Sequence, residues 1–214
     1  MRSIRSEAGV SVEAAKLAKL AQRLKAASRF HASALPSLWF LTDEERTPDP
    51  RAVAARLPTG SGIVLRHYRA MDRNELAEDL AAFARARGLT LLVGADAQLA
   101  AKVKAHGVHI PRWAAMRRSG PRPHGFITTS AHGLGEIKRA EDLGADGVFL
   151  GPLFATQSHR GAQSLGAVRF FGLARKSSLP VFALGGLSAQ NARALNGSGI
   201  AGLGAVGGLL PSTD

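Results

Sequence analysis

From residue 37 onward, short apolar segments alternate along the chain with longer amphipathic segments. Short apolar runs are typical of buried strands, whereas apolar residues at helical spacing indicate helices that pack on one face. The predicted strands are Leu38–Leu41, Gly62–Leu65, Leu89–Val93, Gly107–Ile110, Gly125–Thr129, Gly147–Leu150, Val181–Leu184 and Gly202–Val206. The predicted helices between them include Asn74–Ala86, Ala97–Ala105, His132–Leu143 and Ser188–Leu195. Strands separated by helices favour a parallel sheet with crossover helices.

The number of strands favours an α/β barrel of the (βα)₈ TIM type over a doubly wound open sheet. An internal similarity supports the barrel, because three related hexapeptides occupy residues 105–110, 145–150 and 200–205. Each has glycine at its third position, and they fall on predicted strands four, six and eight. Even-numbered strands of a barrel share layers of side chains, so similar residues there have a packing reason.

Both ends of the chain depart from a regular barrel. Residues Ser11–Ser28 predict an amphipathic helix with leucines near one face and Lys and Arg on the other. Only residues 207–214 follow the eighth strand, which is too few for a full final helix. We therefore predict a basic helical extension over residues 1–36 and a barrel over residues 37–214 with a short or missing final helix. The N-terminal helix is expected to cover the barrel wall that this leaves open.

The composition is that of one globular domain with an excess of basic residues. The 214 residues include no cysteine, which excludes disulfides, thiolate catalysis and Cys-ligated zinc and fits a cytoplasmic location. No apolar run approaches the ~20 residues that span a bilayer, so no membrane association is expected. The net charge of +12 suits anionic substrates. Nucleic-acid binding is the less favoured alternative, because no aromatic-plus-basic motif accompanies the basic residues.

Glycine pairs directly follow the last two predicted strands, as Gly185-Gly186 and Gly207-Gly208. Active sites of TIM barrels lie at the C-terminal ends of the strands, and the loops after strands seven and eight commonly hold phosphate. Glycine lets backbone N–H groups approach such an anion closely. We therefore predict a phosphate site here; two purely structural turns are the alternative. The loop over residues 151–161, which carries hydroxyls, a histidine and an arginine, can close over an anionic ligand; a loop that is merely mobile is the alternative.

Three segments carry a family resemblance: GADGVFLGPLFATQSHRG at 144–161, PVFALGG at 180–186 and GLGAVGG at 202–208. Together with SLWFLTD at 37–43 and GVHI at 107–110, they resemble the thiamine phosphate synthase and thiazole tautomerase superfamily. The likeness is strongest from residue 125 onward. It implies a TIM barrel that binds a thiazole and its phosphate. The residues to which it assigns that binding are Thr156, Ser158, His159, Gly185, Gly186, Gly207 and Gly208.

The resemblance also implies a reaction, in which the synthase joins hydroxymethylpyrimidine pyrophosphate to thiazole phosphate with Mg²⁺ on the leaving pyrophosphate. Magnesium takes oxygen ligands, usually carboxylates. Here the family's Asn-Asp pair after the third strand falls on Gly94-Ala95, and its acidic residue after the fourth falls near Ala114. Arg66 matches the family's arginine after the second strand, but the flanking glutamine and lysine are Val64 and Tyr68. The phosphate half of the site matches, and the magnesium-pyrophosphate half is largely absent.

Three functions remain open from the sequence. The first is a synthase, which would need Mg²⁺ if the family's activity is retained. The second is a metal-independent thiazole tautomerase acting on carboxythiazole phosphate, for which His132 in the family's S-x-H run is the candidate acid–base and Arg66 would meet a carboxylate. The third is a phosphate-ligand binding protein without turnover. A histidine that only hydrogen-bonds locally is the alternative for His132.

The predicted partners follow from these functions. They are a phosphorylated thiazole in each case and, for the synthase, a pyrimidine pyrophosphate that would meet Arg66. No HxH or HxxxH spacing supports a histidine metal site, so no residue is assigned to metal. A homodimer is left open.

Overall fold

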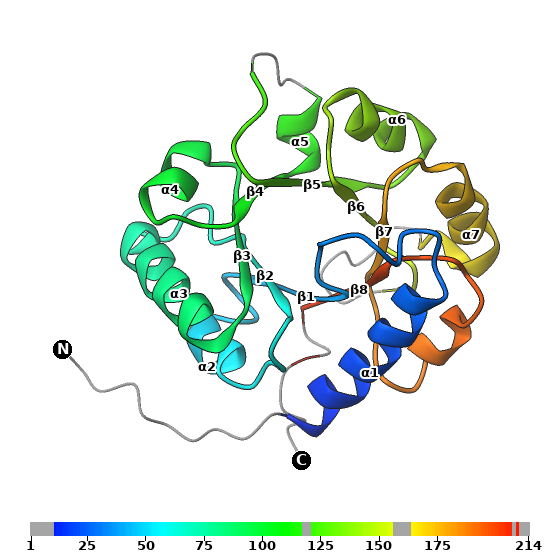
Figure 1. The fold of residues 1–214 in the computed structure, drawn as a ribbon, viewed down its shortest axis with the longest axis horizontal. Coiled ribbons are helices and arrows are strands. Elements are labelled where there is room, and N and C mark those ends of the chain that lie inside the picture. Colours follow the sequence, from blue (N-terminus) through cyan, green and yellow to red (C-terminus); the bar gives the residue numbers. More distant parts are fainter. Residues whose placement is uncertain (1–10, 117–120, 156–163, 207–208, 210–214) are drawn as a thin grey trace.

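The structure, a computed structural model, describes residues 11–116, 121–155, 164–206 and 209. Its eight strands form a closed barrel in the order β1 to β8, with β8 pairing back to β1 (Figure 1). Every pair of neighbouring strands is parallel. The strands are β1 (Leu38–Leu41), β2 (Gly62–Leu65), β3 (Thr90–Gly94), β4 (Gly107–Ile110), β5 (Phe126–Ala131), β6 (Gly147–Leu150), β7 (Val181–Leu184) and β8 (Gly202–Ala205). The predicted TIM barrel is confirmed, and each predicted strand is present within a few residues of its expected bounds.

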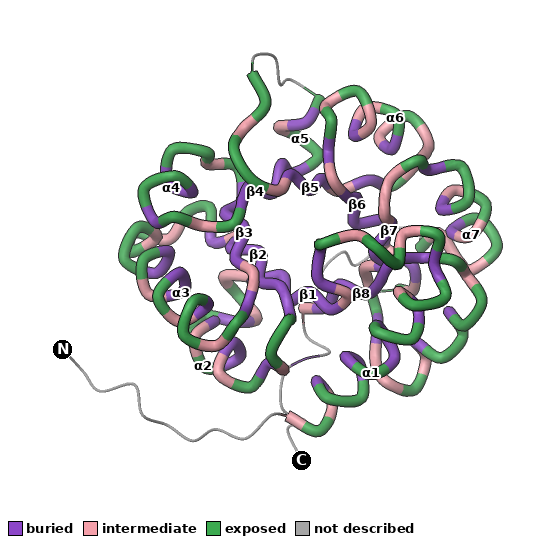
Figure 2. Tube along the Cα trace, in the orientation of Figure 1, coloured by how far each residue is buried: buried purple, intermediate pink, exposed green. Residues whose placement is uncertain are grey.

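Helices cover the outside of the barrel, with one side of each exposed to solvent and the strands buried beneath them (Figure 2). The crossover helices are α2 (Pro50–Ala54), α3 (Arg73–Arg87), α4 (Ala97–Lys102), α5 (Arg112–Ala115), α6 (Leu134–Asp142) and α7 (Gly166–Lys176). The prediction of a helix over residues 188–195 is wrong, because only a 3₁₀ turn, η2 (Ala192–Leu195), forms there. The Ser188 N–H donates to Asn191 Oδ1 at 2.9 Å, and Asn191 Nδ2 donates to the Gly186 carbonyl at 2.6 Å. The Asn191 N–H also donates to Ser188 Oγ at 3.4 Å, so the two residues form a reciprocal N-terminal cap. The Ala192 N–H donates to the Ser188 carbonyl, but the next backbone bond, from the Ala194 N–H to the Asn191 carbonyl, is of the 3₁₀ type.

Aromatic side chains fill the inside of the barrel. Trp39 meets Phe149 edge-on at 5.7 Å between ring centroids and Phe182 at 6.0 Å. Glycine supplies the room for these rings, since a Cβ on Gly62 would lie 2.1 Å from the Trp39 ring. The barrel is therefore a packed core, and a ligand can bind only at one of its ends.

Helix α1 (Val12–Ala26) lies on the outside of the barrel against β1, β8 and η2 (Figure 1). The Ser11 hydroxyl caps it by accepting the Ala14 N–H at 3.4 Å, and Leu17 and Leu24 are buried beneath it. The helix thus packs on the wall between the last strand and the first. The boundary at residue 36 remains a prediction, and most of the chain after residue 206 lies outside the described residues. No helix in the described part of the chain is long and apolar enough to cross a membrane.

Candidate active site at the C-terminal mouth of the barrel

Side chains alternate between the inside and the outside of a barrel along each strand. Val64 of β2 and Leu92 of β3 belong to the inner cluster, so Arg66 and Gly94 continue the inward-facing rows at the C-terminal end. On β5, Phe126 packs against the same cluster, and Ser130 follows it in the same alternation. The ends of β2, β3 and β5 therefore present these positions to one mouth.

Arg66 is held at this mouth by the residues that follow β1. Its Nε–H donates to the Thr42 carbonyl at 2.8 Å, and Nη2 lies 3.5 Å from Asp43 Oδ2. Burial lowers the pKa of Arg66 from its ordinary value, but an arginine pKa lies so far above neutrality that the guanidinium keeps its charge. Burial acts to raise the pKa of Asp43, and its bonds to Arg46 with the charge of Arg66 bring it below the ordinary value. Arg66 thus presents a fixed positive charge.

His109 forms part of the floor below Arg66. Its Nδ1 lies 3.0 Å from Thr128 Oγ1, its Nε2 lies 3.1 Å from Ser130 Oγ, and its ring meets Phe149 edge-on. Burial, together with the positive charge of Arg66, lowers the pKa of His109 to about 3. The ring is therefore neutral at physiological pH, so one nitrogen donates a hydrogen bond and the other accepts one.

His132 stands at the mouth after β5, as the sequence predicts. Its Nδ1 hydrogen-bonds the Gly151 carbonyl, which requires the proton to be on Nδ1. Within the described residues Nε2 has no partner, so it is the nitrogen open to a ligand. Glu136 fixes the backbone here, because its Oε2 accepts the His132 N–H at 2.5 Å while Oε1 pairs with Arg112. Burial acts to raise the pKa of Glu136, but these two hydrogen bonds hold it below the ordinary value.

Gly185 and Gly186 form the turn after β7 and pack against the segment that follows β6. Both have left-handed φ values, +101° and +64°. A Cβ on Gly185 would lie 2.7 Å from Pro152 Cα, and one on Gly186 would lie 2.7 Å from the Ala155 carbonyl oxygen. No acceptor for the Gly186 N–H lies among the described residues. The two glycines thus allow the two loops to pack closely. They also leave the Gly186 N–H available to donate a hydrogen bond to an anion.

Five of the predicted ligand-binding residues lie outside the described residues. They are Thr156, Ser158, His159, Gly207 and Gly208. Of the described predictions, the structure brings Arg66, His132 and the Gly185-Gly186 turn to the same end of the barrel. His67, which follows Arg66, is buried, with Nδ1 at 2.9 Å from Thr42 Oγ1.

Three carboxylates near the mouth are engaged in other contacts. Asp96 caps α4 by accepting the Leu99 N–H at 2.8 Å, Asp43 pairs with Arg46 and Arg66, and Glu44 accepts the Arg69 N–H. Asp72, the N-cap residue of α3, makes no side-chain cap bond. In residues 11–116, 121–155 and 164–206 no three His, Asp or Glu side chains come together, so the described residues form no preassembled magnesium site.

Two aromatic residues at the mouth were not predicted as site residues. Tyr68, after β2, meets Trp113, after β4, edge-on with 6.2 Å between ring centroids. Arg73 of α3 lies over the Tyr68 ring, 5.5 Å from its centroid. The sequence showed only that a lysine of the family is replaced by Tyr68. The Tyr68 ring reaches the ends of β3 and β4. The sequence pattern does not predict this, because it depends on how the side chain is placed.

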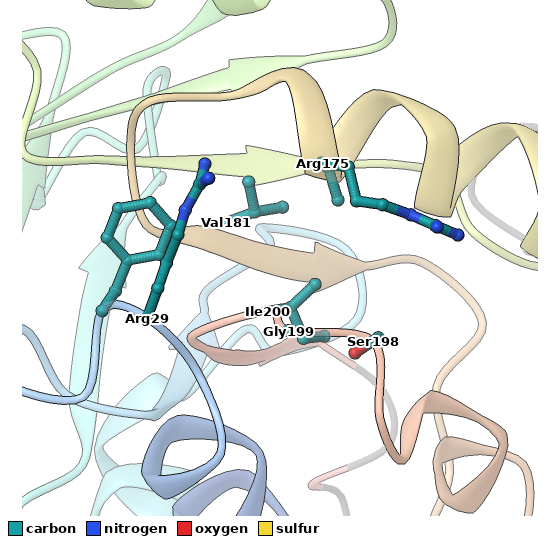
Figure 3. A pocket seen from close by; sticks show the side chains of 8 residues that line it. Arg29, Arg175, Val181, Ser198, Gly199 and Ile200 are labelled. Carbon is teal, nitrogen blue, oxygen red and sulfur yellow. The ribbon is translucent and has the colours of Figure 1, made fainter.

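A separate cavity of about 160 Å³ lies at the opposite end of the barrel. It is lined by Arg29, Phe30, Ala174, Arg175, Val181, Ser198, Gly199 and Ile200. Figure 3 shows the Arg29 and Arg175 side chains on either side of Val181. This residue begins β7, so the cavity is at the N-terminal end of the strands, away from the end where barrels hold their active sites.

A model of the thiamine monophosphate synthase family matches residues 38–209, which is the whole barrel with its C-terminal mouth. The chain belongs to this family. The putative thiamine-phosphate synthase 2 of Aquifex aeolicus is 30% identical over 179 residues, covering 79% of this chain and 96% of that protein. The thiamine-phosphate synthase of Bacillus velezensis is 28% identical over 191 residues, covering 83% of this chain and 85% of that protein.

A solved structure agrees with the barrel. The thiamine phosphate pyrophosphorylase from Pyrococcus furiosus superposes with a TM-score of 0.65 at 23% identity, covering 81% of this chain and 86% of that one. At that identity the likeness supports the fold and no more. The resemblance to the thiamine phosphate synthase family that the sequence motifs carried is confirmed.

Proposed function

We propose that this chain is an enzyme of thiamine biosynthesis that joins hydroxymethylpyrimidine pyrophosphate to thiazole phosphate. The observation that carries the proposal is the family match across the entire barrel, over residues 38–209. Arg66 and the open Gly186 N–H, which come from different strands at the same end of the barrel, support it. One cationic and one backbone anion site suit two phosphorylated substrates.

In this proposal the two anion sites have different ligands. The Gly185-Gly186 turn holds the thiazole phosphate, together with Thr156, Ser158, His159 and Gly207-Gly208 as the sequence predicts. Arg66 meets the pyrophosphate of the pyrimidine substrate. The described residues offer no carboxylate set for magnesium, and Arg66 then supplies the positive charge on this side of the mouth.

The reaction requires these residues to stabilise the leaving pyrophosphate and to position the two substrates. The thiazole nitrogen attacks the pyrimidine methylene carbon, while the carbon–oxygen bond to pyrophosphate breaks and its electron pair leaves with the pyrophosphate. A fixed guanidinium stabilises the charge that develops on the leaving oxygen. Holding both phosphate groups brings the nitrogen and the carbon together, which lowers the entropic part of the barrier. No proton transfer is needed for this bond exchange.

A second candidate is the tautomerase reaction on carboxythiazole phosphate, which does require a proton carrier. The observation that favours it is His132, whose Nδ1 is tied to the Gly151 carbonyl while Nε2 has no partner in the described part of the chain. A neutral imidazole in this tautomer accepts a proton at Nε2 and later returns it. Arg66 would then meet the substrate carboxylate.

One set of assays separates these functions. The purified chain is incubated with hydroxymethylpyrimidine pyrophosphate and thiazole phosphate, with and without Mg²⁺, and thiamine phosphate is measured. Formation of thiamine phosphate supports the synthase, and its absence under both conditions contradicts it. In parallel, turnover of carboxythiazole phosphate that is lost in His132→Ala selects the tautomerase. Binding of thiazole phosphate without either turnover would identify a binding protein.

A further inference from the structure

The side of the mouth near the end of β3 has no room for a metal-binding side chain. Gly94, the last residue of β3, faces inward, and a Cβ there would lie 2.9 Å from Tyr68 Cε1 and 3.1 Å from the Tyr68 hydroxyl oxygen. The same Cβ would lie 2.7 Å from the Leu65 carbonyl oxygen. The Tyr68 ring thus occupies the space into which a side chain at the end of β3 would project.

Contacts from α3 and α5 hold the Tyr68 ring in this place. Arg73, the first residue of α3, donates from Nη1 to the His67 carbonyl and from Nη2 to the Gly94 carbonyl, both at 2.5 Å, with its guanidinium over the ring. Trp113 of α5 meets the ring edge-on. An aromatic ring fixed from two sides, with a cation above it, is a rigid part of the mouth.

Charges of both signs act on Tyr68. Burial has the largest effect and raises the Tyr68 pKa, Arg66 and Arg73 each lower it, and Glu44 raises it. Ala95 carries no ligand atom on its side chain, and Asp96 beyond it is used as the cap of α4. Asp43 pairs with Arg66, but no cluster of three acidic side chains among the described residues opposes Arg66 and Arg73. Two guanidinium groups so placed favour an anion over a divalent cation.

We propose that the face of the mouth formed by Arg66, Tyr68 and Trp113 binds an organic diphosphate directly, without a divalent metal ion. The guanidinium of Arg66 meets the diphosphate, since an arginine fork suits phosphate oxygens. The Tyr68–Trp113 pair forms the wall beside it. This inference rests on the proposed function for the identity of the ligand, but its test needs no turnover.

The test is the affinity of the full chain for inorganic pyrophosphate, measured by titration calorimetry in EDTA and in excess Mg²⁺. We expect the affinity in EDTA to equal or exceed that in Mg²⁺, because free Mg²⁺ only competes for the pyrophosphate. Arg66→Ala should weaken binding about tenfold or more, which corresponds to ~1.4 kcal/mol. Arg66→Lys, which keeps the charge but not the fork, should bind with intermediate affinity. Melting curves check that each variant is folded.

The matched control is Arg175→Ala, which removes an exposed arginine from the cavity at the other end of the barrel. Its affinity for pyrophosphate should equal that of the unsubstituted chain. Three results would overturn the proposal: binding at least tenfold tighter in Mg²⁺, no binding in either buffer, or equal weakening in Arg66→Ala and Arg175→Ala. The comparison between buffers needs no variant and decides the role of the metal even if Arg66→Ala fails to fold.

The assays distinguish failure of the proposed synthase function from failure of the metal-free diphosphate site. If pyrophosphate binds in EDTA but thiamine phosphate never forms, the proposed synthase function fails and the metal-free diphosphate site stands. If thiamine phosphate forms only with Mg²⁺ and pyrophosphate binds only with Mg²⁺, the function stands and the metal-free site fails.

Discussion

Replacing Gly186 by alanine tests whether the turn after β7 is set by its backbone conformation or by its contact with the loop after β6. The left-handed φ of +64° costs a residue with a Cβ about 1–2 kcal/mol. About 0.4–1 kcal/mol of this cost is offset, because alanine restricts the unfolded chain more than glycine does. The new Cβ would also lie 2.7 Å from the Ala155 carbonyl oxygen and 2.8 Å from Phe154 Cβ, and overpacking of this kind costs about 1–3 kcal/mol.

Two other glycines separate these contributions. Gly60 has a similar φ of +79° but nothing within 4 Å of its Cβ position, so Gly60→Ala carries the conformational cost alone. Gly172 lies in α7 with open space around it, and Gly172→Ala should stabilise the chain by ~0.5–1 kcal/mol. Gly186→Ala should therefore be the least stable of the three, by about 1–3 kcal/mol relative to Gly60→Ala.

The assay is thermal unfolding of the three variants beside the unsubstituted chain. In a domain of this size each kcal/mol moves the melting temperature by about 2–4 °C, so Gly186→Ala should melt about 2–12 °C below Gly60→Ala. The affinity for thiazole phosphate should fall in Gly186→Ala and stay unchanged in the two controls. Equal melting temperatures for Gly186→Ala and Gly60→Ala would refute the argument from contact.

Three further predictions concern the buried histidine, the N-terminal helix and the carboxylate at the mouth. His109 has a pKa of about 3 when folded and near 6.5 when unfolded, so between these values the unfolded chain binds more protons and stability falls as the pH falls, by up to ~1.4 kcal/mol per pH unit. In His109→Gln, the free energy of unfolding measured in urea should change less between pH 6.5 and 5 than in the unsubstituted chain. The same pH dependence in both chains would contradict the lowered pKa of His109. Leu17→Ala in α1 should lower the free energy of unfolding by about 2–5 kcal/mol, against less than ~0.5 kcal/mol for the exposed Val12→Ala, and equal losses would show that α1 does not pack on the barrel. Because the folded pKa of Glu136 is lowered, the stability that this carboxylate adds is present above its unfolded pKa and is lost as the pH falls. The melting temperatures of Glu136→Gln and of the unsubstituted chain should therefore converge at low pH. Melting temperatures that differ more as the pH falls would contradict this prediction.

The strand positions could be predicted because most strands are short apolar runs, although β5 carries two threonines and a serine. The turn at Gly185-Gly186 could also be predicted, since a glycine pair directly after a barrel strand favours a tight turn. The segment over residues 188–195 begins with a helical cap between Ser188 and Asn191 but continues only as the 3₁₀ turn η2. Apolar spacing does not distinguish an α-helix from so short a 3₁₀ segment.

The candidate site, too, could be predicted only in part. That Arg66 and His132 lie at the mouth follows from their positions directly after strands. Which atom of His132 is open, and what fills the space beside Gly94, depends on contacts between loops distant in sequence.

The sequence by itself determined the barrel, the family and the place of the glycine turn after β7, because hydrophobic periodicity and glycine positions are local properties of the chain. Only the tertiary structure decided that Tyr68 closes the space at the end of β3 and that Asp43 and Asp96 are already engaged. These facts arise from side chains of three loops meeting at one end of a closed barrel. No local pattern encodes such a meeting, since it requires the strands to be brought together first.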